Sequence, residues 1–274
     1  MKIIPKEMKR RARIALTGNY FPAVSLTVSL TLLTTALTLL IQQSGLYLSA
    51  DPLNQVLYWV LYLIALLFGA LLEAGLLRFL YSLCKGKPLR ERGILFSAFR
   101  NQADTYILTY AFRYLVSLVW FVPSLYFYMQ LPVVIDLTEI PADLPYLLGM
   151  SLLLAAIALI PAVLFALPYC LAVYVLLDDP NRPARDALRQ SRRLTRGQRG
   201  RIFRLWLGFL PLCLLGIGSF GVGFLWIRPY FHTAMGEVYL ELTGHRTAAD
   251  QQPQSSQNAF GTQGTASSGF SSED

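Results

Sequence analysis

Arginine is concentrated in one stretch of this sequence, residues 178–204, DDPNRPARDALRQSRRLTRGQRGRIFR, which holds nine arginines, no lysine and three aspartates. A guanidinium group presents a planar fork of donors that suits phosphate oxygens. We therefore expect the segment to contact anionic groups, with the phosphates of membrane lipids as the nearest candidates. The plainer alternative is that these arginines only orient the chain and lie in solvent. The residues expected to make the contacts are Arg185, Arg189, Arg192, Arg193 and Arg196.

Two charged residues lie inside apolar runs: Glu73 and Arg113. Charged side chains within membrane helices are costly and often line a substrate or proton path, so the two could form an intramembrane polar pair of this kind. The structural alternative is that both lie within two turns of the membrane surface. They would then extend their charged ends to that surface, or pair only to hold helices together.

The remaining polar residues predict no catalytic, cofactor or metal site. His232 and Glu237 are separated by about 140° around a helix, so they do not share a face well. The cysteines are scattered and form no CxxC or Cys/His pattern. A nucleophile–base pair, paired carboxylates and a dinucleotide fingerprint are all missing from the sequence. We expect a protein that is not an enzyme and that binds no cofactor or metal.

Composition indicates that most of the chain lies in a membrane. Of 274 residues, 54% are hydrophobic and 15% are charged, whereas soluble domains are about 25% charged. Apolar runs long enough to span a bilayer occur at 20–41, 53–81, 105–129, 146–177 and 203–227. The net charge of +8 lies mainly between or before these runs. These positions are typical of basic residues that determine which loops stay in the cytoplasm. We therefore expect no nucleic-acid binding.

The distribution of basic residues predicts the orientation. Residues 1–19, 82–104 and 178–204 are basic and should be cytoplasmic, whereas 42–52 and 131–145 contain no Lys or Arg and should be external. The last apolar stretch has two interpretations. It is either one span that ends outside, or two helices joined by a turn at 216–221, which gives six helices and a cytoplasmic C-terminus. We favour the turn, although the final helix is weakly hydrophobic and contains several charges.

The elements that would position the charged groups follow from helical spacing. Within the Arg-rich segment Asn181 is a plausible cap, and Gly197 should end the helix. Its apolar face should consist of Ala184, Ala187, Leu188, Ser191 and Leu194. The N-terminal segment should be an amphipathic helix on the membrane surface that places Met8, Ala12, Ala15 and Leu16 on one face, and residues 95–99 should form a shorter one. Pro161 and Pro168 should kink the fourth span.

Two unequal parts make up the chain. Residues 1–245 should form an integral membrane domain. Residues 246–274 are rich in Gln, Ser, Gly and Thr and have almost no aliphatic side chains, so they should be a disordered C-terminal tail.

Three pieces of the sequence resemble a family of bacterial integral-membrane proteins designated domain of unknown function 975 (DUF975). They are AGLLRFLYSLCKGKPLRERGILFSAF, LPYCLAVYVLLDDPNRPARDALRQSRRLTRGQRGRIFRLWLGFL and GIGSFGVGFLWIRPYFHTAMGEVYLEL. The family often has a Gly-Pro pair late in the second span, where this chain has Leu72-Glu73-Ala74-Gly75. The resemblance covers about residues 1–245 and implies a multi-pass protein of the bacterial cytoplasmic membrane. It carries no catalytic residues over.

These observations predict an all-α, polytopic membrane bundle of five or six helices with cytoplasmic amphipathic helices. The N-terminus should be cytoplasmic, and so should the C-terminus. We expect a non-enzymatic scaffold or accessory subunit that contacts anionic lipids or a partner membrane protein. The alternative is a small transporter or permease component, for which inverted repeats and polar residues at the midplane of the membrane would be expected.

Overall fold

The computed structural model describes residues 3–46, 51–86, 89, 93–100, 103–130 and 143–244. Within these ranges the chain is helical and no strand occurs, which confirms the predicted all-α fold. The predicted tail at 246–274 lies outside the described residues. In chain order the elements are α1 (Pro5–Leu16), α2 (Tyr20–Gln43), α3 (Pro52–Cys84), η2 (Ile94–Phe96), α4 (Ser97–Arg100), α5 (Ala103–Met129), α6 (Leu144–Ala166), η3 (Leu167–Tyr169), α7 (Ala172–Asp178), α8 (Ala184–Thr195), α9 (Arg199–Leu207), α10 (Leu210–Gly218) and α11 (Phe224–Thr243).

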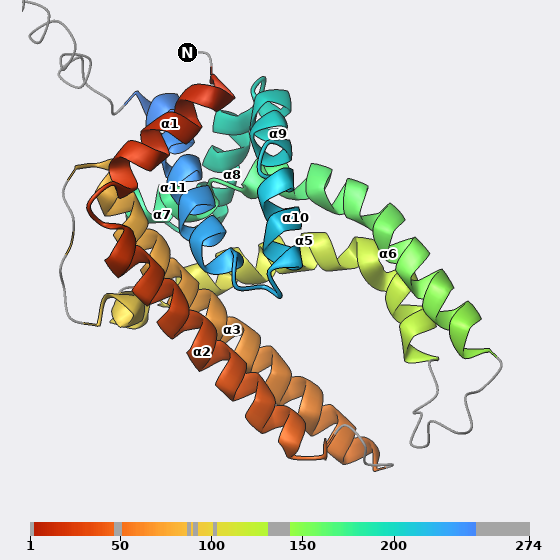
Figure 1. Ribbon diagram of the computed structural model, residues 1–274. Helices are drawn as coiled ribbons and strands as arrows, with labels where there is room; N and C mark the ends of the chain where they lie inside the picture. The colour runs from red at the N-terminus through yellow and green to blue at the C-terminus, as the bar shows by residue number, and fades with distance from the viewer. Residues whose placement is uncertain are drawn as a thin grey trace, which may run out of the picture.

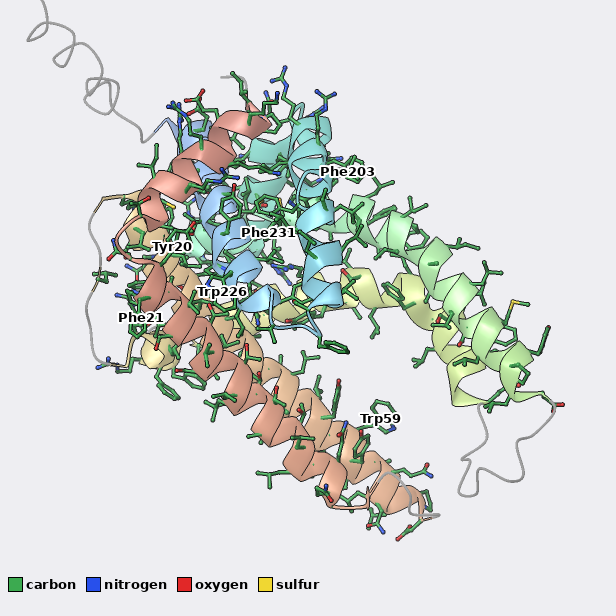
Figure 2. All side chains as sticks on the ribbon, viewed as in Figure 1. Tyr20, Phe21, Trp59, Phe203, Trp226 and Phe231 are labelled. Atoms are coloured by element: carbon green, nitrogen blue, oxygen red, sulfur yellow. The ribbon has the colours of Figure 1, made fainter. Side chains whose placement is uncertain are left out.

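Five helical stretches in the described part of the chain are long and apolar enough to cross a membrane: Tyr20–Gln43, Pro52–Cys84, Ala103–Phe127, Leu144–Asp178 and Arg199–Gly218. They correspond to the predicted apolar runs and indicate a multi-pass membrane protein. Figure 1 shows that α2–α3 and α5–α6 form two hairpins that diverge from a group made by the remaining helices. In Figure 2 Trp59 projects outward from α3, as expected of a ring at a lipid-facing surface.

The buried core lies where the second half of α3 meets α7 and α11 (Figure 1). In this core the buried side chains of α3 lie between Ala70 and Leu83, and those of α11 lie between Tyr230 and Leu240. The outer halves of the two hairpins expose large apolar side chains instead, such as Leu40 and Leu152. This contrast is expected when lipid covers the outer halves and protein covers the inner ones.

A turn joins α10 to α11, as predicted. Phe220 and Gly221 have positive φ values of 52° and 88°, and the left-handed conformation at Gly221 is one that glycine adopts without steric cost. However, α11 is not among the five helices of the described residues that are long and apolar enough to cross a membrane, so its composition does not support the favoured sixth span. Its charged residues lie against protein instead, because α11 packs on α1, α2, α3 and α10.

The N-terminal helix α1 has the predicted amphipathic character, with Met8, Ala12 and Leu16 buried. The face that we expected to lie on the membrane is instead covered by α11 and α9. Arg11 bridges Glu7 of its own helix, at 2.9 Å, and Glu241 of α11, at 2.8 Å. The hydrogen bond and the charge of Arg11 lower the pKa of Glu7 from its usual value. These contacts attach α1 to the end of α11.

Gly75 allows the segment after α3 to fold back onto it. A Cβ atom at this position would lie 2.3 Å from the carbonyl oxygen of Leu95, so only glycine permits this approach. Leu95 is buried by the contact, whereas Phe96 and Phe99, which share its predicted apolar face, remain exposed.

Candidate functional site

The Arg-rich helix α8 has one apolar face and one arginine face. Ala184, Ala187, Leu188 and Ser191 are buried as predicted, and Thr195 is buried in place of the half-buried Leu194. The cap differs from the prediction, because Pro183 precedes the first helical residue and Asn181 lies outside the helix. The chain turns at Gly197, with φ 81°, as predicted for the end of the helix.

A helix break in the fourth span holds α8 in place. The helix continues through Pro161 but breaks at η3, where Pro168 cannot donate a backbone hydrogen bond. The buried hydroxyl of Ser191 donates to the carbonyl of Pro168 at 2.8 Å and accepts from the amide of Leu171 at 3.2 Å. Thr195 also donates to the Pro168 carbonyl, at 3.5 Å. The break leaves backbone groups without helical partners, and α8 supplies the missing partners.

The arginine face borders an open depression of about 710 Å³. Its lining comes from α8, from Arg196 and Gly197 in the turn after α8, and from the first residues of α9. Arg185 is exposed on the same helix but does not border the depression. The arginines that border it are Arg189, Arg192, Arg193, Arg196 and Arg199. We refer to it as the arginine depression.

Four of the five predicted contact residues therefore lie together, and Arg199 was not predicted to be one. The signal for Arg199 was the glycine at 197, which reverses the chain and brings the start of α9 beside the end of α8. Acidic neighbours are scarce: Asp186 lies 3.9 Å from Arg189, and both side chains are mostly exposed. Within the described residues the other four arginines make no ion pair. The depression thus concentrates uncompensated positive charge.

Glu73 occupies a second polar site, at the contact of α3 with α11. Its Oε2 accepts a hydrogen bond from Nη2 of Arg228 at 3.2 Å, and its Oε1 lies 3.7 Å from Nε2 of His232. The positive charge of Arg113 lies near enough to Glu73 to interact with it electrostatically, but Arg113 forms no ion pair within 4 Å among the described residues. The carboxylate is only 12% exposed. We refer to Glu73, Arg113, Arg228 and His232 as the charged cluster.

Asp178, the last residue of α7, connects α7 to α3 and α11. Its carboxylate accepts hydrogen bonds from Tyr81 of α3 at 3.2 Å and Tyr239 of α11 at 3.3 Å. Lys85 forms an ion pair with it at 2.6 Å. The ring of Tyr174 lies against both tyrosines, with centroids 6.0 and 6.2 Å away. This group fixes α3, α7 and α11 relative to one another.

Metal-ligating side chains are dispersed. In the described ranges no three His, Cys, Asp or Glu side chains come together in a way that would hold a metal ion. His232 is directed to Glu73, and Glu237 is buried further along α11 with 1% exposure. Cys84, Cys170 and Cys213 form no disulfide bond with one another.

Comparison with known proteins agrees with the resemblance seen in the sequence. The family profile described as "Protein of unknown function (DUF975)" matches residues 1–246, which include all the helices described above. No curated protein and no solved structure matches the chain. Since the match extends from the first residue past the end of α11, the chain belongs to the DUF975 family.

Proposed function

We propose that this protein is a non-enzymatic component of the bacterial cytoplasmic membrane that binds anionic lipid headgroups through the arginine depression. It would act there as a scaffold or as an accessory subunit of a partner membrane protein. The observation that carries the proposal is the convergence of five arginines from two helices on one open depression. The position of α8, which places four of them, is set by the buried Ser191 contact.

Electrostatics favours a bound anion at this surface. Like charges one turn apart destabilise a helix, so α8 gains stability when an anion lies against it. A basic side chain near an anionic leaflet contributes about 1 kcal/mol, so the five arginines would contribute about 5 kcal/mol together. The volume of about 710 Å³ is within the range of small-molecule sites and is large enough for a lipid headgroup.

The position of the depression supports a cytoplasmic location. Figure 1 shows α8, α1 and both ends of the described chain at one end of the molecule, opposite the ends of the two hairpins. Short basic segments remain on the cytoplasmic side during insertion. The cytoplasmic leaflet is also the one whose surface potential is negative, so the arginines would face anionic lipid.

The non-enzymatic part of the proposal rests on how the polar residues are used. Asp178 and its tyrosines connect helices, and Ser191 supplies the partners missing at a helix break. The sequence also has no nucleophile–base pair or paired carboxylates.

The test is lipid retention by purified full-length protein. We would extract the protein with its surrounding membrane and measure the bound anionic lipid by mass spectrometry. In the test variant Arg189, Arg192, Arg193 and Arg196 are replaced by Gln, and anionic lipid should decrease several-fold without loss of the helical fold.

A matched control has the same change in charge within the same segment. Its replacements are Arg182, Arg185, Arg201 and Arg204→Gln, none of which borders the depression. The proposal requires a larger loss in the test variant than in this control. Equal losses would mean that only the total charge matters. Co-purification of a stoichiometric protein that is lost from the test variant would identify an acidic partner as the occupant.

The charged cluster favours a second candidate function, a small transporter or permease component. Glu73 and Arg113 lie on membrane spans, and a charged residue in a span often marks a proton or ion path. The break at Pro168 is similar to the discontinuous helices of transporters, although here Ser191 already satisfies the backbone groups at the break. Proteoliposomes loaded with a pH-sensitive dye would test this function. A proton flux that is abolished in Glu73→Gln but kept in the surface variant Glu7→Gln would support it.

A further inference from the structure

A small cavity of about 90 Å³ lies where α3, α4, α5 and the end of α7 meet. Figure 1 shows the short turn of η2 and α4 beside α3, next to the start of α5. Three polar side chains border the cavity: Arg78 of α3, Ser97 of α4 and Tyr106 of α5. The rest of the lining is apolar and includes Ala74 and Leu177. The cavity therefore combines one cation and two hydroxyl groups with apolar walls.

Ser97 has an unused hydrogen-bonding group at this cavity. The residue is 2% exposed, and its Oγ has no hydrogen-bond partner in the described part of the protein. A buried hydroxyl without a partner costs about 1–3 kcal/mol, so such groups are normally satisfied by protein, water or a ligand. The hydroxyl of Ser97 therefore indicates that something polar belongs in the cavity.

Arg78 brings a positive charge to the same cavity. Its side chain is half-buried and forms no ion pair within 4 Å among the described residues. The carboxylate of Asp178, on the neighbouring helix end, is already engaged by Lys85 and by the hydroxyl of Tyr81. A half-buried cation without a counter-charge is costly and is stabilised by an anion.

We propose that this cavity binds a single phosphate group, held by the guanidinium of Arg78 and the hydroxyls of Ser97 and Tyr106. All three are donors, and the guanidinium fork suits two phosphate oxygens at once. The volume equals that of about three liquid water molecules, which is suitable for one small oxyanion and too small for a complete lipid headgroup. The apolar walls strengthen these contacts by excluding water.

This site is separate from the arginine depression. Its lining comes from α3, α4, α5 and the end of α7, and none of the arginines of α8 or α9 borders it. The phosphate group could belong to free inorganic phosphate or to the monoester end of a lipid such as phosphatidic acid. Both sources present the same chemistry to the three donors. The inference goes beyond the proposed function, and each can fail without the other.

The test is equilibrium dialysis of the full-length protein in phosphatidylcholine nanodiscs against radiolabelled inorganic phosphate. We expect saturable binding of one phosphate per chain. Arg78→Gln should weaken it by about tenfold or more, and Ser97→Ala by about fivefold, because hydrogen bonds to a charged group are lost. Matched controls are Arg204→Gln and Ser29→Ala, which alter exposed residues elsewhere and should bind as the wild type does.

Competition identifies the source of the phosphate. Displacement of the label by short-chain phosphatidic acid at lower concentration than by phosphate would assign the site to a lipid monoester, and the reverse order would assign it to free phosphate. Absence of saturable binding by either probe would overturn the proposal, and so would unchanged affinity in Ser97→Ala. If Arg78→Gln does not fold, Ser97→Ala decides alone. Loss of binding only in the variant of the four α8 arginines would also overturn it.

Discussion

Replacing Ser191 with alanine tests how α8 is held, and it changes none of the arginines. The side chain is fully buried and connects α8 to the break in the fourth span. Alanine removes one hydroxyl and leaves the rest of the buried face of α8 intact. We expect the protein to become less stable and the arginine depression to lose its fixed shape.

The structure gives the size of the effect. Without the hydroxyl, the amide of Leu171 loses its 3.2 Å partner and has none in the broken helix. The carbonyl of Pro168 loses the 2.8 Å bond but keeps the longer one from Thr195 at 3.5 Å. An unsatisfied buried group costs about 1–3 kcal/mol. With one group lost entirely and one in part, the free energy of unfolding should fall by about 2–4 kcal/mol.

Two measurements check this prediction. Unfolding in mixed detergent micelles gives the change in free energy, and hydrogen–deuterium exchange of the 165–175 segment reports on the amide of Leu171. The control is Ser29→Ala, an exposed hydroxyl that bonds only to its own helix, and it should change the free energy by less than about 0.5 kcal/mol. Retention of anionic lipid should also decrease in Ser191→Ala, although every arginine remains.

The reasoning would be refuted if Ser191→Ala unfolded like the wild type and exchange at residue 171 were unchanged. In that case α8 would be positioned by its apolar contacts alone. Loss of stability with unchanged lipid retention would show instead that the arginines bind lipid without needing a fixed α8.

Three further predictions concern other parts of the molecule. Gly75→Ala should destabilise the protein by about 1–3 kcal/mol, because its Cβ would meet the backbone of the 94–96 turn, and thermal unfolding in detergent would show it. Glu73→Gln should cost about 1.5–3 kcal/mol, since Arg228 loses its charged partner, and the double variant with Arg228→Gln should recover part of this loss in a double-mutant cycle. A reporter that is active only in the cytoplasm, fused after Asp274, should be active, because α11 returns the chain to the end of the molecule that holds α1 (Figure 1), and an inactive reporter would place the C-terminus outside.

Much of the fold could be predicted because it depends on local pattern. The apolar length of the first four spans and the 3.6-residue repeat of α8 are properties of consecutive residues, and both are found in the structure. The turn between α10 and α11 was visible in its glycines for the same reason. The position of α11 was harder to predict, because its charged residues allowed either a span or a helix covered by protein. In the structure α11 packs against α1, α2 and α3, and Glu241 and Arg228 form ion pairs with residues of α1 and α3.

For the candidate sites, too, local sequence pattern predicts one part and helix packing decides the other. The sequence alone determined that arginines would lie on one face of a helix that follows the fourth span, since spacing of three and four residues places side chains on one side. Tertiary structure decided that Arg199, at the start of α9, lies beside that face. It also decided that Ser191 holds α8 at a proline break and that Arg228 forms an ion pair with Glu73. Glu73 and Arg228 lie 155 residues apart in the chain. Such contacts depend on how helices pack, which is the sum of many weak interactions, and no short stretch of sequence contains that sum.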